Sequence, residues 1–236
     1  MIYEKDKRII TIEEETSHNP IQLMGKFAGE CWQANTEDSD KNYKRGLDCI
    51  KSGHGRVLEF PQIYLKVEGY SARFVREYYV HVGGAPTRLQ ASTRYIDYTK
   101  SGFDFVIPPA IEKDQEARLR YLQAMHHINE EIRQLIDIYE IPKEDAAMLL
   151  PLGMTSTFVV RTNARNLIDM SRQRCCNRAY HEYRLFMQHL KEALSAYDEE
   201  WKELLDLQFG AKCDFLGYCP EAKGCGKYPH KENLQN

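Results

Sequence analysis

No apolar stretch in this sequence approaches the ~20 residues that an α-helix needs to cross a bilayer. The first residues, Met1–Ile10, are charged and contain no hydrophobic segment of the kind found in secretory signals. We therefore expect no membrane segment and a cytoplasmic location. The formal net charge is only −3, which argues against a general nucleic-acid coat but leaves room for a local basic pocket.

The common signatures of catalytic sites are also absent. The sequence has no GxxxxGK[ST] loop, no GxGxxG turn, no GxSxG elbow and no HExxH motif. Internal repeats, low-complexity tracts and a clear interdomain linker are missing as well. With 42% hydrophobic and 28% charged residues among 236, the composition is that of an ordinary globular protein with ample chain for a core.

The pattern that is present mixes helical and extended segments. Ile63, Leu65 and Val67 alternate with polar residues, which predicts a half-buried strand. Long helices with few strands indicate an α+β fold in one domain over residues 1–209, followed by a Cys- and Gly-rich tail over 210–236. The expected strands are Ile9–Ile12, Gln62–Glu68, Ser92–Tyr98, Phe103–Ile107 and Met154–Arg161, and the expected helices are Asn19–Cys31, Asp38–Ser52, Glu112–Tyr139 and Arg178–Leu207.

The segment Thr162–Arg184 combines high charge with an apolar stripe. Asn163 stands where a helix would open after a strand. Leu167, Met170 and Arg174 then share one stripe at spacings of three and four. Because a guanidinium stays charged and needs acceptors for its donors, an arginine on such a stripe usually has a fixed anionic partner. That partner is either a structural carboxylate or a bound phosphate.

Two loop-like segments carry polar groups suited to ligand binding. Ser52–Phe60 contains His54, and Gln90–Tyr95 places small hydroxyl residues beside Arg94. Hydroxyl, guanidinium and backbone N–H groups can all donate hydrogen bonds to a phosphate. Taken alone, composition favours a polar turn for the first segment and an edge strand with a surface arginine for the second.

In their order and spacing, these segments resemble the flavin-dependent thymidylate synthases of the ThyX type. In that family a Gly-His loop leads through a Glu into a strand, and a helix then ends in Arg-His-Arg ahead of Ser-x-Arg-Tyr. A Leu-Pro, an Asn-x-Arg-x-Leu segment, an arginine and Ala-Gln-x-Glu-Ile follow downstream. The counterparts here are Gly53-His54, Glu59, His81, Ser92–Tyr95, Leu150-Pro151, Asn163–Leu167, Arg174 and Ala179–Tyr183, with Ala28–Trp32 similar to the end of the family's first helix.

The chain departs from this family pattern at positions that contact flavin or nucleotide. Val80 and Val82 flank His81 where the family has two arginines. Glu77 stands in place of a glutamine near the pyrimidine, and Ala147 in place of an arginine used for the nucleotide. These changes weaken what the resemblance implies about cofactor and substrate more than what it implies about the fold.

The resemblance implies a ThyX-like α+β fold, a single domain with long helices and a small, mostly antiparallel sheet. It also implies an enzyme that methylates dUMP reductively to dTMP, with methylenetetrahydrofolate as carbon donor, NADPH as reductant and FAD as cofactor. The family needs no cysteine nucleophile on the pyrimidine. The implied assembly is a homotetramer with active sites between subunits, with neither nucleic acid nor membrane as a partner.

Carried over residue by residue, the resemblance gives Arg174 a catalytic place at the uracil edge, where it would stabilise negative charge developing on the ring. Ser92 and Arg94 would hold the dUMP phosphate, with Gln90 beside them and Glu77 near the pyrimidine. The residues implied for the flavin or folate side are His54, His81, Asn163, Arg165 and Asp169.

Some of these residues have structural alternatives as well. His81 follows Glu77 by four residues, so the two could simply pair on a helix. Asp169 could equally be a helix-surface partner of Arg165 or Arg172. For Arg174 the alternative is a structural ion pair.

The tail carries Cys213, Cys219 and Cys225 at equal spacing, with His230 beyond. In reducing compartments, cysteine clusters favour metal over disulfides, and four ligands is the number typical of structural zinc. The spacing is looser than that of a CxxC pair, so zinc competes with a loop of reduced thiols. The other cysteines lie in helix-like contexts and are expected to be buried thiols: Cys31, Cys49, Cys175 and Cys176.

Two rival functions follow from the departures. Glu77 and Ala147 favour a related flavoenzyme that acts on another pyrimidine nucleotide. Val80 and Val82 favour a non-catalytic nucleotide-binding homologue that kept the fold and lost the flavin. Turnover of a different nucleotide would identify the first rival, and nucleotide binding without flavin or turnover would identify the second.

Overall fold

The computed structural model describes residues 7–81 and 86–234, so Val82 lies outside the described residues. Within those ranges, no helix is both long and apolar enough to cross a membrane. The elements, in order, are β1 (Ile9–Ile12), α1 (Pro20–Glu30), α2 (Ser39–Lys51), η1 (Gly55–Glu59), β2 (Gln62–Ser71), α3 (Ala72–Tyr78), β3 (Thr87–Gln90), α4 (Tyr98–Ser101), α5 (Pro109–Glu112), α6 (Gln115–Asp137), α7 (Lys143–Ala146), η2 (Ala147–Leu149), β4 (Thr155–Asn163), α8 (Ala164–Arg174), α9 (His181–Tyr197), α10 (Glu199–Gln208), α11 (Lys212–Leu216) and η3 (Lys231–Asn233).

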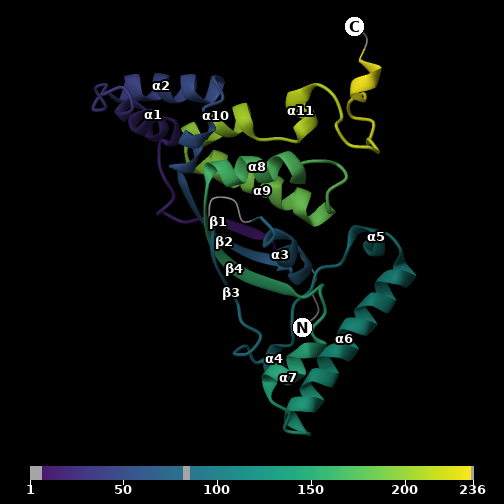
Figure 1. Ribbon diagram of the computed structural model, residues 1–236. Coiled ribbons are helices and arrows are strands. Elements are labelled where there is room, and N and C mark those ends of the chain that lie inside the picture. Colours follow the sequence, from purple (N-terminus) through teal and green to yellow (C-terminus); the bar gives the residue numbers. More distant parts are fainter. Residues whose placement is uncertain (1–6, 82–85, 235–236) are drawn as a thin grey trace. The chain divides into compact units, whose positions relative to one another are not determined.

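The strands form one four-stranded sheet in the order β1-β2-β4-β3 (Figure 1). The backbone N–H of Ala72 donates to the carbonyl of Met154, and that of Ala164 to the carbonyl of Pro61. Residue numbers increase along one strand as those of the paired residues decrease along the other, so β2 and β4 run antiparallel. Long helices around a small antiparallel sheet confirm the expected α+β class.

The chain divides into two compact units, and all of their boundaries but the one between Val80 and His81 fall within strands. The first unit comprises Met1–Ile9, Lys66–Val80 and Arg88–Val159, and the second comprises Ile10–Leu65, His81–Thr87 and Val160–Asn236. The tail after residue 209 therefore belongs to the same unit as the helices that precede it. The expected separation of 1–209 from 210–236 stays a prediction.

Each unit has its own apolar core. In the first unit, α6 contributes Met125 and Ile132 to a cluster with aromatic side chains such as Phe105. In the second unit, α9 and α10 pack against each other and bury, among others, Leu194 and Trp201. The long amphipathic patterns in the sequence therefore correspond to buried faces.

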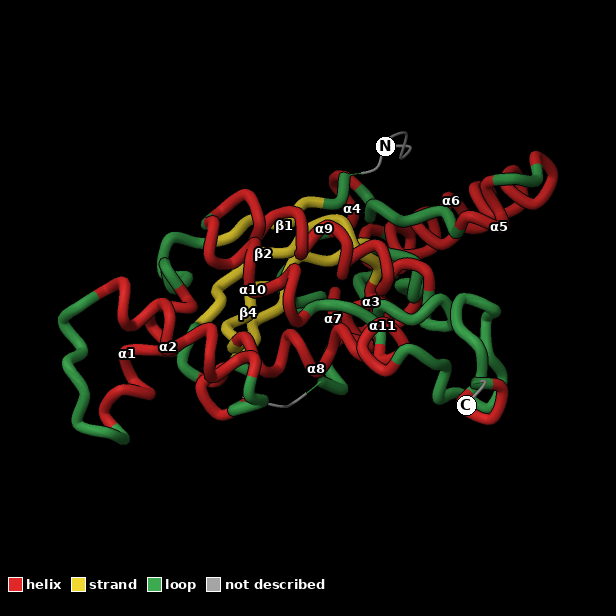
Figure 2. The backbone as a smooth tube through the Cα atoms, turned by 90° about the horizontal axis from the view of Figure 1, so that it is seen from above, coloured by secondary structure: helices red, strands yellow, loops and turns green. Residues whose placement is uncertain are grey.

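Helices α1 and α2 of the second unit lie side by side (Figure 2) at a distance that only glycine permits. A Cβ added to Gly25 would lie 1.7 Å from the carbonyl oxygen of Asn42, and one added to Gly46 would lie 2.0 Å from that of Ile21. Both contacts are far shorter than van der Waals distance and involve backbone, which cannot move aside. Side chains at either position would push the helices apart.

The start of α1 has a different cap from the one that its sequence suggests. Asn19 precedes Pro20 as expected, but its backbone is left-handed (φ 48°) and its side chain makes no capping bond. Instead the buried carboxylate of Glu200, on α10, accepts from the backbone N–H of Ile21 at 2.8 Å and of Gln22 at 2.9 Å. A negative charge there also complements the helix dipole.

The expected helix Arg178–Leu207 is wrong as a single element. It is interrupted at Asp198, whose backbone is extended (φ −159°, ψ 137°). The Asp198 carboxylate accepts from the backbone N–H of Glu200 and of Trp201, which makes it the N-cap of α10. The apolar period continues across the break, so periodicity alone could not reveal it.

Two expected strands are also wrong. Ser92–Tyr98 is a turn, in which the backbone N–H groups of Tyr95 and Ile96 both donate to the carbonyl of Ser92. Local bonds of this kind compete with sheet pairing, and the strand β3 ends just before them. Phe103–Ile107 forms only an isolated bridge, between Phe105 and Met154.

Candidate active site

The helix α8 begins at Asn163, as the sequence predicts. The Asn163 side chain accepts a hydrogen bond from the backbone N–H of Asn166 at 2.9 Å, and the residue is buried. The amide of Asn166 in turn donates to the hydroxyl of Thr162 at 2.8 Å. These bonds fix the residue at which the helix starts and the orientation of its first turn. A contact of Asn163 with flavin or folate stays a prediction.

Arg165, in the first turn of α8, reaches toward the segment that carries His54. Its guanidinium forms an ion pair with Glu59 at 2.9 Å and lies 4.0 Å from the carboxylate of Asp169. The guanidinium carbon is also 3.9 Å from the position that a Cβ on Gly55 would occupy. Arg165 is thus held beside the His54–Gly55 loop. The contact with Asp169 is the helix-surface pairing given above as the alternative to a cofactor role.

The exposed His54 lines an open groove of about 520 Å³ in the second unit. Three aromatic residues shape this groove, and two of them, Phe27 and Phe60, stack with ring centroids 4.4 Å apart. The third, Trp32, remains 63% exposed at the same groove. A concave, mostly apolar surface with a few polar groups is typical of a small-molecule site.

The side chains of this groove fit a flat heteroaromatic ring. Phe27, Phe60 and Trp32 offer aromatic surface, while Gly53 and His54 bring backbone and imidazole to the same place. None of the three aromatic residues was singled out by the sequence as a site residue. The available signal was the match of Ala28–Trp32 to the family's first helix, but only the folded chain brings Phe60 to it.

Arg174 lies at the end of α8 and is partly buried. Its Nε donates a hydrogen bond of 2.9 Å to Nε2 of His81, and its guanidinium carbon is 4.7 Å from the ring centroid of the buried Tyr183. The same Tyr183 ring meets His81 edge-on at 5.8 Å. Because His81 accepts at Nε2, this arrangement needs a neutral imidazole with its proton on Nδ1.

The three residues Arg174, His81 and Tyr183 therefore hold one another. An imidazole and an aromatic face contact the arginine. The carboxylate or phosphate partner that the sequence suggests stays a prediction. His81 lies beyond the end of α3 at Tyr78.

The remaining expected site residues lie in the first unit. The amide of Gln90 donates to the hydroxyl of Ser156 at 3.1 Å, and the hydroxyl of Ser92 accepts from the backbone N–H of Arg94 at 3.3 Å. Arg94 forms an ion pair of 2.7 Å with Glu144, and both side chains are more than half exposed. Glu77 is half-buried on α3. Ser92 and Arg94 are thus close neighbours in one turn, as phosphate binding requires.

The cysteine tail does not contain a preformed metal site. Across residues 7–81 and 86–234, no group of three or more His, Cys, Asp or Glu side chains is arranged to hold an ion. His230 nevertheless lies near Cys219: its Nε2 and the Cys219 sulfur are 3.1 Å and 3.4 Å from the position of a Cβ on Gly224. Zinc at Cys213, Cys219, Cys225 and His230 stays a prediction.

A family model and the relatives compared with this chain all indicate one family. The model for thymidylate synthase complementing proteins matches residues 12–197. The flavin-dependent thymidylate synthase of Nitratidesulfovibrio vulgaris is 30% identical over 220 residues, which cover 88% of this chain and 86% of that relative. The protein of the same name from Pyrococcus abyssi is 30% identical over 219 residues, 88% of this chain and 85% of that relative.

Solved structures confirm the ThyX-like fold. Thymidylate synthase X from Helicobacter pylori, crystallised with FAD and dUMP, superposes with a TM-score of 0.64 at 19% identity, over 84% of this chain and 99% of that one. A UMP/dUMP methylase, PolB from Streptomyces cacaoi bound with 5-Br dUMP, gives a TM-score of 0.68 at 18% identity, over 87% and 97%.

Proposed function

This chain belongs to the family of thymidylate synthase complementing proteins, and we propose that it is a flavin-dependent thymidylate synthase that converts dUMP to dTMP by reductive methylation. The observation that carries this proposal is the placement of Arg165 against the His54–Gly55 loop, beside an aromatic groove. Methylenetetrahydrofolate is the carbon donor, NADPH the reductant and FAD the cofactor.

The groove is where the chain would hold the flavin ring or the folate. FAD, when bound, supplies the hydride chemistry, and the protein supplies position and electrostatics. His54 and the aromatic residues Phe27, Trp32 and Phe60 offer surfaces for stacking. Arg165, His81, Asn163 and Asp169 complete the set proposed for that side.

Arg174 is the proposed catalytic residue. At the edge of the uracil ring, its guanidinium would stabilise the negative charge that develops on the ring as the new bond to carbon forms. The contacts with His81 and Tyr183 orient the guanidinium before any ligand arrives. A charge that is already oriented costs little reorganisation in the transition state.

Ser92 and Arg94 are proposed to bind the dUMP phosphate, with Gln90 beside them and Glu77 near the pyrimidine. The Ser92 hydroxyl and the Arg94 guanidinium are both phosphate donors placed on one short turn. In this structure the guanidinium of Arg94 is paired with the carboxylate of Glu144. The dUMP phosphate would displace that carboxylate.

The family resemblance supports three further proposals. The enzyme acts as a homotetramer whose active sites lie between subunits. It functions in the cytoplasm, with dUMP and folate as its ligands. It has neither nucleic acid nor membrane as a partner.

The first test is the visible absorption spectrum of the purified protein, recorded again after addition of FAD and gel filtration. A retained flavin band is expected, followed by formation of dTMP from dUMP, methylenetetrahydrofolate and NADPH. Failure to retain flavin, even with dUMP present, would favour the rival function of a non-catalytic, nucleotide-binding homologue. Flavin retention with turnover of UMP but not of dUMP would favour the rival function of a flavoenzyme that acts on another pyrimidine nucleotide.

A matched pair of histidine variants makes this test specific to the groove. His54→Ala should weaken flavin retention and lower turnover, because His54 lines the proposed ring site. His127→Ala is the control, since His127 is 74% exposed on α6 and pairs only at long range with Glu131 (3.7 Å). Equal flavin retention by both variants would exclude the groove as the flavin site.

A further inference from the structure

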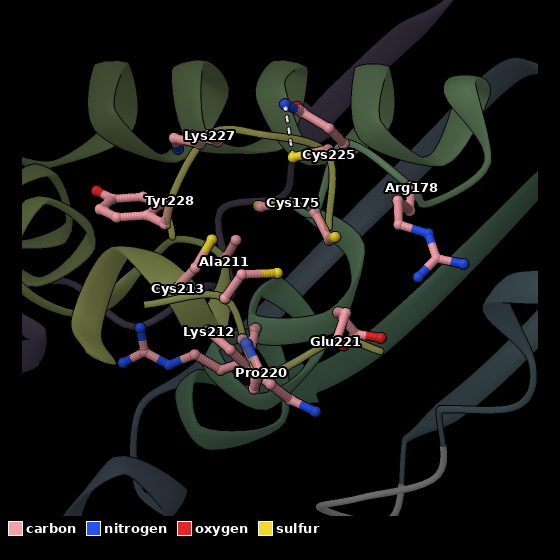
Figure 3. A pocket seen from close by; sticks show the side chains of 14 residues that line it. Cys175, Arg178, Ala211, Lys212, Cys213, Pro220, Glu221, Cys225, Lys227 and Tyr228 are labelled. Atoms are coloured by element: carbon pink, nitrogen blue, oxygen red, sulfur yellow. Dashed lines mark hydrogen bonds between the residues drawn. The ribbon is translucent and has the colours of Figure 1, made fainter. Parts of the chain in front are cut away.

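Five of the seven cysteines line one small cavity in the second unit (Figure 3). Two of them, Cys175 and Cys176, follow the end of α8, and the others come from the tail about 40 residues later. Figure 3 shows Cys175, Cys213 and Cys225 around the same space. Segments distant in sequence thus bring their thiols together. The cysteines that line the cavity are Cys175, Cys176, Cys213, Cys219 and Cys225.

Direct bonds tie the two segments. The side-chain amide of Asn177 donates to the sulfur of Cys225 at 3.6 Å (Figure 3), and Arg178 donates to the carbonyl of Lys223 at 2.7 Å. Within the tail, Lys227 forms an ion pair of 2.6 Å with Asp214. The tail is therefore folded back onto the turn that follows α8.

The guanidinium of Arg172 also lies over the ring of Phe215, but the outer part of the tail is exposed. Residues 220–227 are all exposed, and pairing in this region is limited to an isolated bridge between Cys219 and His230. A short segment without an apolar core usually needs a disulfide or a metal to fix its structure. The cysteines are free thiols, so no disulfide supplies that constraint.

We propose that Cys176, Cys213, Cys219 and Cys225 bind one zinc ion that fastens the tail to the end of α8. The cavity measures about 20 Å³, which admits roughly one water-sized body. That volume suits a single ion. Thiolates are soft ligands, and four of them form the closed tetrahedral shell of structural zinc.

The charge around the cavity suits such a site. Four thiolates and a divalent cation leave two net negative charges, and four basic side chains line the cavity against one acidic side chain, Glu221. Binding releases the thiol protons to solvent and needs no oxidant or reductant. The basic residues are Arg172, Arg178, Lys212 and Lys227.

Cys176 takes the fourth place, which the sequence had given to His230. Cys176 lines the cavity, whereas His230 does not. Cys176 is also next in sequence to Asn177, whose side-chain amide donates to the sulfur of Cys225, so it lies where the two segments meet. Since the sulfurs are not yet arranged as a ligand set, side-chain rotation completes the shell on binding.

The metal itself is tested on the full chain, purified in reductant without an added metal or a metal-affinity step. Elemental analysis should find one zinc ion per chain, and replacement by Co²⁺ should give intense tetrahedral bands with sulfur-to-cobalt charge transfer. Reduced protein without bound metal would overturn the proposal, as would stoichiometric iron and sulfide. This readout is independent of enzyme activity and of flavin.

Variants identify the ligands. Cys176→Ser should lose stoichiometric zinc, whereas Cys175→Ser, the neighbouring control, should retain it together with the cobalt spectrum. His230→Ala should also retain zinc. Full retention by Cys176→Ser, or loss in His230→Ala alone, would refute this ligand set. If Cys176→Ser does not fold, the intensity of the charge-transfer band in the cobalt-loaded parent protein still counts the thiolates, and a value for three would refute the assignment.

Discussion

Two arginines expected to bind the same nucleotide are held in opposite ways. Arg174 in the second unit is partly buried and fixed by the imidazole of His81 and the ring of Tyr183. Arg94 in the first unit is 65% exposed and bound to Glu144, which is itself 52% exposed. An imidazole and an aromatic ring contact the first, whereas a carboxylate in solvent pairs with the second.

The difference corresponds to two kinds of task. A group that stabilises a transition state gains from being oriented in advance. A group that captures a phosphate can exchange one anion for another, because an exposed ion pair contributes only about 0–1 kcal/mol. Four predictions test this contrast, from the largest expected effect to the smallest.

Arg174→Lys should lower kcat by about 10²–10³-fold, the loss typical of removing one transition-state donor. An ammonium lacks the planar fork that His81 and Tyr183 hold in place. Steady-state kinetics with saturating dUMP measures the effect. Arg120→Lys is the control, because Arg120 is 77% exposed on α6 and should be silent. A near-normal kcat for Arg174→Lys would remove Arg174 from the chemistry.

Arg94→Gln should raise KM for dUMP by about 10- to 100-fold with little change in kcat, since a hydrogen bond to a charged group contributes roughly 1.5–3 kcal/mol. Glu144→Gln should leave KM unchanged or lower it, because Arg94 then has no carboxylate to give up. A fall in kcat at unchanged KM for Arg94→Gln would contradict a binding role and make the two arginines alike.

Tyr183→Leu should lower kcat between about 2- and 30-fold, because a cation–π contact contributes roughly 0.5–2 kcal/mol. Tyr183→Phe keeps the ring and should retain activity. Tyr183 is buried, so Tm of both variants separates lost orientation from lost stability. Equal kcat values for Leu and Phe, at matched Tm, would show that the ring does not orient Arg174.

The smallest expected effect is that of added salt, which should change the contribution of Arg94 more than that of Arg174. KM for dUMP should rise a few-fold with ionic strength, because exposed charges are screened over about 8–10 Å at physiological salt. kcat should stay nearly constant, since the Arg174 contacts are partly buried. In Arg94→Gln the salt dependence of KM should shrink. An unchanged dependence would place the phosphate elsewhere.

Local patterns predicted part of this architecture well. The strand β1, the strand that ends at Asn163 and the helix that Asn163 caps all form where the sequence indicates. Each depends on neighbours within a few residues, on alternation, on a cap or on a proline. The grouping of Ser92 and Arg94 was also predicted, although their segment is a turn and not the expected strand.

What the sequence could not reveal depends on long-range contacts. The break at Asp198 lies inside an uninterrupted apolar period, and the cap of α1 comes from a residue about 180 positions later. Phe27 meets Phe60 only after two helices have packed. The imidazole partner of Arg174 lies 93 residues away, where spacing along one helix indicated only that some partner was needed.

The Glu200 cap also bears on how the protein is made. The backbone N–H groups at the start of α1 have their carboxylate acceptor on α10. The two residues of the Ile21–Glu200 bond are 179 positions apart. At a synthesis rate of roughly 5–20 residues per second, that separation corresponds to about 10–40 s on the ribosome. The first long helix to be made is therefore among the last to be capped, and during that interval α1 relies on α2, which emerges soon after it and packs through Gly25 and Gly46.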